Sequence, residues 1–129
     1  MVKVSLSIRF LAIWLAVSAA GCATIAPPPT PTLPPEAVEG RLVFERTCST
    51  CHSAQLDMIV VGPSLAGIAT RGGTRIPGKD AETYIRDSIV NPGAYTVEGF
   101  REGLMPEEVY ESLTAEEFEA VVAYLMTLK

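Results

Sequence analysis

Three parts of the chain show apolar residues at helical spacing, and none shows the alternation of apolar and polar residues that predicts a half-buried strand. The first predicted helix covers residues 36–46. The second covers residues 81–90, with Asp80 as its N-cap, and Asn91-Pro92 ends it because proline disfavours a helical residue before it. The spacing therefore predicts helices in both segments.

The strongest pattern lies near the C-terminus. Thr114 and Glu117 have the spacing of a capping box at the start of a helix. One apolar stripe follows at helical spacing: Phe118, Val121, Val122, Leu125 and Met126. Together with the other two segments, this helix predicts an all-α domain with three main helices.

Long irregular segments separate the predicted helices. Residues 62–78 and 91–106 are rich in glycine and proline. Loops of this length are uncommon in a small domain unless they surround something, and a domain of this size has only a modest core of its own. We therefore expect a bound group to supply part of the interior.

Residues 1–21 have the composition of a secretory signal peptide, with a positively charged start, a short apolar run and small residues before Cys22. This ending resembles the lipobox of bacterial lipoproteins, in which the cysteine is lipidated and becomes the N-terminus, although Ala19 stands where that motif usually has leucine. Cleavage without lipidation and an uncleaved N-terminal helix are the alternatives. Lipidation of Cys22 would anchor the protein to the cell membrane, facing the periplasm or the cell exterior.

A proline-rich segment, residues 22–36, starts at the predicted lipidation site. Its prolines favour polyproline II, which rises about 3.1 Å per residue and makes a semi-rigid spacer. A proline-rich recognition site for another protein is the alternative. We predict a tether that holds a folded domain, residues 37–129, close to the membrane.

The motif Cys48-Ser49-Thr50-Cys51-His52 contains the only histidine of the chain. Two cysteines at this spacing can form a redox dithiol, half of a zinc site or an attachment site for haem. Zinc needs about four ligands, whereas the folded part offers only Cys48, Cys51 and His52, and no strand–helix context for a thioredoxin-like dithiol is visible. Haem attachment uses all three residues, because both thiols add to the porphyrin vinyl groups and the histidine binds iron. The motif therefore predicts one covalently attached haem c.

Methionine is the expected ligand on the opposite face of the iron, because the chain has no second histidine. Met58 follows His52 too soon to cross easily to that face, and Met126 belongs to the apolar stripe of the last helix. Met105 lies well downstream, in a loop that also contains glycine and proline. We therefore predict that Met105 ligates the iron. Packing on the haem without ligation is its alternative role.

These features together resemble a class I cytochrome c, with the attachment motif near the start of the domain and the axial methionine before the last helix. The resemblance covers residues 37–129 and implies that family's fold, in which helices and long loops surround one haem. It implies that the Pro63 carbonyl accepts a hydrogen bond from His52 and orients the ring. It also implies a close crossing of the first and last helices at Gly40, Phe44, Val121 and Tyr124.

A respiratory subset of the family is similar to this chain over residues 84–92, 94–95 and 97–100. The subset comprises the cytochrome domains fused to subunit II of caa3-type oxidases and the small monohaem lipoprotein subunit of alternative complex III. The predicted lipidation site, the tether and the short length favour the second. The similarity implies a place in a respiratory or photosynthetic chain, beside other redox subunits, with another cytochrome, a copper protein or a terminal oxidase as acceptor.

An iron with ligands on both faces has no open site, so we predict outer-sphere transfer of one electron and no catalysis by this chain. Methionine ligation raises the reduction potential. A haem peroxidase or gas sensor with a labile Met105 is one alternative, which the lack of a distal histidine disfavours. A structural subunit whose haem lies on no electron route is the other.

The chain is acidic, with a net charge of −5, and several glutamates lie near Met105 in the sequence: Glu98, Glu102, Glu107, Glu108 and Glu111. We expect no nucleic-acid partner, because phosphate contacts need a basic surface. The glutamates are either a solvated surface, or they face a partner that is basic or mostly apolar there. The candidates for pairing with haem propionates are Arg71, Arg75 and Arg86, and the sequence does not choose among them.

Overall fold

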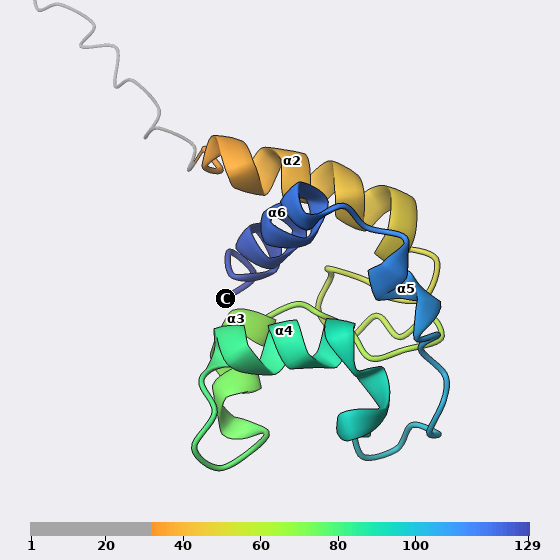
Figure 1. Ribbon diagram of the computed structural model, residues 1–129. Helices are drawn as coiled ribbons and strands as arrows, with labels where there is room; N and C mark the ends of the chain where they lie inside the picture. Colours follow the sequence, from red (N-terminus) through yellow and green to blue (C-terminus); the bar gives the residue numbers. More distant parts are fainter. Residues whose placement is uncertain (1–31) are drawn as a thin grey trace, which may run out of the picture. The chain divides into compact units, whose positions relative to one another are not determined.

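The computed structural model describes residues 32–129. Within these residues the chain forms five α-helices and no strand, which confirms the prediction of an all-α fold (Figure 1). Helices α2 (Pro35–Val43), α4 (Ala81–Val90) and α6 (Ala115–Leu125) are the longer ones and correspond to the three predicted helices. Helices α3 (Ile68–Arg71) and α5 (Glu108–Glu111) have four residues each and were not predicted.

The starts of α4 and α6 have the caps that the sequence predicts. At α4, the Asp80 side chain accepts a hydrogen bond of 2.7 Å from the backbone N–H of Thr83. At α6, Thr114 Oγ1 accepts a hydrogen bond of 3.2 Å from the backbone N–H of Glu117, and the Glu117 carboxylate accepts one of 3.0 Å from the backbone N–H of Thr114. These bonds satisfy donors that a helix start leaves without intrahelical partners.

The first helix extends further than predicted at both ends. It begins at Pro35, where the missing N–H of proline costs no hydrogen bond, so its first turn includes the last residues of the predicted spacer. After Val43 the chain continues as a π-helix, Phe44–Cys48. Such π-turns are rare and often occur at functional sites. Here the π-helix carries the chain from α2 directly into the attachment motif.

Helices α2 and α6 cross closely (Figure 1), and the backbones meet at Gly40. A β-carbon at Gly40 would lie 1.8 Å from the carbonyl oxygen of Ala120, so any larger residue would push the two backbones apart. Beside the crossing, the rings of Phe44 and Tyr124 have centroids 5.4 Å apart, and Val121 is fully buried. The predicted contact between the first and last helices is confirmed.

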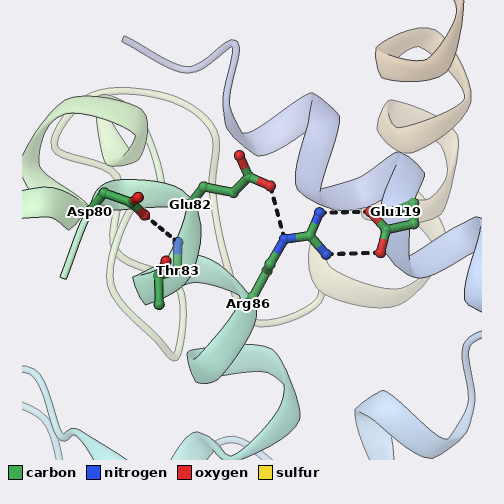
Figure 2. A network of polar contacts seen from close by, with 5 residues as sticks. All are labelled: Asp80, Glu82, Thr83, Arg86 and Glu119. Carbon is green, nitrogen blue, oxygen red and sulfur yellow. Dashed lines mark hydrogen bonds and ion pairs between the residues drawn. The ribbon is translucent and has the colours of Figure 1, made fainter.

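A network of ion pairs joins α4 to α6 (Figure 2). The Arg86 guanidinium donates to both carboxylate oxygens of Glu119, at 2.8 and 2.6 Å, and its Nε donates to Glu82 at 2.9 Å. These hydrogen bonds hold the pKa of Arg86 above its usual value, and those to Glu119 contribute most to the shift. The guanidinium carbon also lies 5.5 Å from the centre of the Phe118 ring. Arg86 is therefore engaged in holding two helices together.

The predicted signal peptide, residues 1–21, lies outside the described residues, as do Cys22 and most of the predicted tether. The signal, the lipidation and the tether therefore stay predictions. Among the helices of residues 32–129, none has both the length and the apolar character needed to cross a membrane.

Candidate functional site

The residues that the sequence predicts to bind a haem line one cavity. Its lining includes Cys48, Cys51, His52, Pro63 and Met105, which come from the end of the π-helix, the following loop and the segment between α4 and α5. The cavity with its open mouth has a volume of about 1260 Å³. This volume includes space that is open to solvent. Its lining brings together residues that are far apart in the sequence, from Thr47 to Leu125.

The other walls of the cavity are mainly apolar and come from elements that are distant in sequence. Helix α3 contributes Ile68, α4 contributes Tyr84, Ile85 and Ile89, and α6 contributes Leu125. These side chains belong to the hydrophobic core or lie at its inner surface. A ligand in this cavity would therefore continue the core, as the long loops of the sequence led us to expect.

The two cysteines reach the cavity through one tight turn. Cys48 ends the π-helix, and its carbonyl oxygen accepts hydrogen bonds from the N–H groups of Cys51 and His52, at 3.1 and 2.9 Å. The thiols are not joined in a disulfide. Burial raises the pKa of the Cys48 thiol to about 11, although the nearby Arg46 charge opposes the shift. This thiol is therefore neutral at physiological pH.

The imidazole of His52 is held from two sides. Nδ1 lies 2.8 Å from the carbonyl oxygen of Pro63, and because a carbonyl can only accept, Nδ1 carries the proton. Nε2 then keeps a lone pair that can bind a metal. Gly62 lies against the ring, since a β-carbon there would be 2.5 Å from Cε1. Two consecutive residues thus set the tautomer and the orientation of the ring.

Arg71 holds the loop that carries Pro63. Its guanidinium donates hydrogen bonds to the carbonyl oxygens of Ser64 and Ala66, one and three residues after the proline. The same loop is tied to the residue after His52, because the backbone N–H of Leu65 donates to the Ser53 carbonyl at 2.7 Å. The position of the Pro63 carbonyl is therefore fixed by contacts that the sequence did not reveal.

The lining of the cavity contains Arg71, Arg75 and Arg101. Burial lowers the pKa of Arg71 below its usual value, and the positive charge of Arg75 lowers it further. Two like charges at one cavity favour an anionic group there. Arg86, the third candidate from the sequence, is absent from the lining and is bound to Glu82 and Glu119. Of the three arginines that the sequence offers as partners of haem propionates, Arg71 and Arg75 line the cavity. Arg101, which the sequence did not single out, lines it as well.

Met105 lines the cavity and packs against the core. The other two candidates from the sequence, Met58 and Met126, are absent from the lining. Met58 is 45% exposed in the loop after the attachment motif, and Met126 packs against the core at the end of α6. Met105 is therefore the methionine that shares the cavity with His52.

The donor set of this cavity suits a haem. It combines two thiols for covalent attachment, an imidazole nitrogen and a thioether sulfur for the iron, and guanidinium groups for carboxylates, all set in apolar walls. A zinc ion would not use the apolar volume or the arginines.

The cytochrome c family model matches residues 37–129, which is most of the chain. No curated protein matches the sequence significantly. Members of this family bind covalently attached haem c, so the match confirms the cofactor predicted from the cysteine–histidine motif.

Proposed function

The chain belongs to the cytochrome c family, and we propose that it carries single electrons as the lipid-anchored subunit of a quinol-oxidising membrane complex. When bound, haem c supplies the one-electron Fe(III)/Fe(II) couple. The observation that carries the electron-transfer part of the proposal is that His52 and Met105 line the same cavity as the two attachment thiols.

Each of these residues has its own task in the proposal. Cys48 and Cys51 would hold the haem, and Nε2 of His52 and the sulfur of Met105 would ligate the iron. The Pro63 carbonyl keeps the proton on Nδ1, so Nε2 stays available. If both His52 and Met105 bound the iron, the chain would leave no ligand position for a substrate. The haem would then supply outer-sphere transfer of one electron.

The arginines of the cavity suit the two carboxylates of a haem. Arg71 and Arg75 bring two positive charges to the lining, and we propose that they hold the propionates. Guanidinium groups pair well with carboxylates because their N–H donors match the two oxygens. Arg71 also keeps its bonds to Ser64 and Ala66, so it links the propionate side of the cavity to the loop that orients His52.

A titration of the reduced protein with carbon monoxide tests the ligand set. If the chain fills both axial positions, carbon monoxide will not bind rapidly at neutral pH, and the visible spectrum will stay unchanged after mixing. Rapid binding would contradict the carrier function. It would instead favour the alternative, a peroxidase or gas sensor in which the Met105 bond is labile.

The membrane part of the proposal rests on the N-terminal sequence and on residues 84–100. The predicted lipid anchor at Cys22 and a short spacer would keep the domain close to the outer surface of the cell membrane, beside other redox subunits. Residues 84–92, 94–95 and 97–100 are similar to both the monohaem subunit of alternative complex III and the cytochrome domain of caa3-type oxidases, and the predicted anchor and spacer favour the first. The acceptor would be another cytochrome, a copper protein or a terminal oxidase.

Purification from native membranes in mild detergent tests this assignment. A resident subunit will remain bound to its complex, and the purified assembly will oxidise a quinol. Purification of the protein alone would indicate an independent tethered shuttle.

A further inference from the structure

The loop after the attachment motif exposes many apolar side chains. Within residues 32–129, nine large apolar side chains are exposed, and five of them lie in residues 56–61, which we call the apolar loop. Leu56 is 80% exposed, Ile59 67% and Val60 50%. Side chains this exposed add little to the core. Five of them within one six-residue segment favour an interaction surface there.

The C-terminal end of the apolar loop is fastened to the attachment motif by backbone hydrogen bonds. The backbone N–H groups of Val61 and Gly62 both donate to the carbonyl oxygen of Cys51, at 3.1 and 2.8 Å. At the other end, Asp57 has a φ of 55°, and within residues 32–129 it is the only residue other than glycine in the left-handed region. The chain therefore adopts a disfavoured conformation within the apolar loop.

The position of the apolar loop connects it to the cofactor. Val61, its last residue, lines the cavity together with Cys51 and His52. The exposed part of the loop, Leu56 to Val60, thus continues directly from the wall where the haem is attached. A protein that contacts this part would lie beside the cofactor, and an apolar contact would exclude water from the space between them.

The sequence around the apolar loop is almost free of charge. Between Arg46 and Arg71, Asp57 is the only acidic residue, and there is no lysine or arginine. The exposed glutamates near Met105 belong to a different segment, residues 98–111. Apart from a group opposite Asp57, charged groups of a partner placed on the apolar loop would lose hydration without gaining a partner charge. A surface of this composition therefore matches an uncharged one.

We infer that the apolar loop is the surface through which the protein contacts its redox partner, and that the partner is a protein with an uncharged, apolar patch there. The inference rests on the proposed electron-carrier function and adds the chemistry of the partner. A loop of six residues offers a small contact area. Small interfaces, below about 1,200 Å² in total, are typical of electron-transfer contacts.

Two other occupants fit the apolar loop less well. Segments that lie in a membrane interface usually contain Trp, Tyr, Lys or Arg, and residues 47–65 contain none of these. The acidic chain would also be repelled by an anionic lipid surface. A stable dimer of this chain would need about 800 Å² on each copy, which one short loop does not offer.

The test compares two triple variants of the full-length, haem-loaded protein in membranes from a strain that lacks the native chain. The loop variant combines Leu56→Ser, Ile59→Ser and Val60→Ser. The control variant removes the same number of exposed aliphatic side chains elsewhere, through Val38→Ser, Leu42→Ser and Val90→Ser. Two rates are followed by haem absorbance: electron transfer with the membrane partner, and reaction with hexaammineruthenium, a small reagent that needs no docking surface.

We expect the loop variant to slow electron transfer in membranes about tenfold or more, as removal of central contacts does in other interfaces. The control variant should stay within about twofold of the wild type, and neither variant should change the ruthenium reaction. If the triple loop variant also slows the ruthenium reaction, the same two rates are measured for the single variant Ile59→Lys, which changes one strongly exposed position. Slower electron transfer in membranes with an unchanged ruthenium reaction then supports the inference, and a wild-type rate in membranes overturns it. A loop variant that transfers electrons in membranes at the wild-type rate would overturn the inference.

Two further measurements exclude the other occupants. Loop-dependent binding to vesicles of phosphatidylcholine and phosphatidylglycerol would show a lipid surface instead. Loop-dependent self-association in sedimentation would show a second copy, and either result overturns the inference. The proposed function fails in a different way: a wild-type protein that hexaammineruthenium neither oxidises nor reduces would not be an electron carrier at all.

Discussion

Gly62 lies so close to the His52 imidazole that a β-carbon would be 2.5 Å from Cε1 and 3.0 Å from Nδ1. On the same ring, Nδ1 is 2.8 Å from the carbonyl oxygen of Pro63. The backbone of Gly62 does not have a positive φ, so the site needs glycine for its missing side chain and not for its conformational freedom. Two neighbouring residues therefore determine where the His52 ring, the proposed iron ligand, points.

Gly62→Ala should push the imidazole away from Pro63 and destabilise the haem-loaded protein by about 1–3 kcal/mol, the usual cost of overpacking. Thermal unfolding will measure this loss. Because a displaced ring also weakens the iron–histidine bond, we expect the reduction potential to change as well.

The matched control for this substitution is Gly93→Ala. A β-carbon at Gly93 would have its nearest neighbour at 3.8 Å, and the residue has no positive φ. We expect it to leave the potential unchanged. Equal behaviour of the two alanine variants would show that the contact with His52 does not position the ring.

Met105→Ala should abolish the weak near-infrared band that reports an iron–methionine bond and should lower the reduction potential, because the thioether favours the ferrous state. We expect these effects at Met105 because it is the candidate methionine that lines the cavity. Near-infrared absorption of the oxidised protein and a redox titration will measure both effects. Met58→Ala is the control, since Met58 lies outside the lining. Loss of the band in the Met58 variant alone would refute the assignment.

The sequence predicts the helices that carry local signals. The caps of α4 and α6 each join residues only three positions apart, so their spacing is visible in the sequence. At α4 the pair is Asp80 and Thr83, and at α6 it is Thr114 and Glu117. The four-residue helices α3 and α5 are too short for an apolar stripe. The π-helix Phe44–Cys48 has no recognisable periodicity either, and its register depends on the packing of Phe44 against α6.

In the candidate site too, the residues with local sequence signals were predicted and those that depend on tertiary contacts were not. The thiols and His52 follow from one motif, and Met105 follows from the lack of another histidine. The role of Arg86 was not predictable, because its partner Glu119 lies 33 positions away and the pairing depends on how α4 and α6 meet. The contact between Gly62 and His52 was likewise hidden, since a glycine beside a proline is most simply read as a turn.

Arg75→Gln should lower the reduction potential, because loss of a positive charge near the haem favours the ferric state. Arg71→Gln should do the same and should also lower thermal stability, since Arg71 holds the carbonyl groups of Ser64 and Ala66. Redox titration and thermal unfolding of each variant will separate the two roles.

Arg86→Gln is the control for charge removal. Arg86 is bound to Glu82 and Glu119 and does not line the cavity, so its removal should leave the potential nearly unchanged. A larger shift of the potential in the Arg86 variant than in the Arg75 variant would contradict the assignment of the propionate partners.

Acid should weaken the link between α4 and α6. The hydrogen bonds from Arg86 hold the pKa of Glu119 below its usual value of 4.5. Because the folded-state pKa is lowered, this contribution to stability is present above pH 4.5 and is lost as the pH falls through the folded-state value. We therefore expect Glu119→Gln to reduce the loss of melting temperature between pH 5 and pH 3. Glu116 lies three residues before Glu119 in α6 and has no ion pair within residues 32–129. Glu116→Gln should therefore not reduce the loss of melting temperature.

Cys22→Ser should release the protein from membranes without harming haem attachment. The acyl chains of a lipidated cysteine supply the membrane affinity, whereas the haem is held by Cys48 and Cys51, far along the chain. Fractionation of cells, followed by haem staining of the membrane and soluble fractions, will measure the release. Cys48→Ser is the matched control: it should impair attachment of the haem and leave the anchor intact.

A Cys22→Ser protein that stays in the membrane fraction would mean that an uncleaved helix or a tight partner holds it instead. The mass of the N-terminus of the native protein then separates these two cases. A chain that still begins at Met1 would indicate an uncleaved N-terminal helix. A chain cut near Ala19 to Gly21 would indicate cleavage without lipidation and a tight protein partner. The second result would itself favour the resident subunit, because a shuttle without its anchor has nothing to keep it at the membrane.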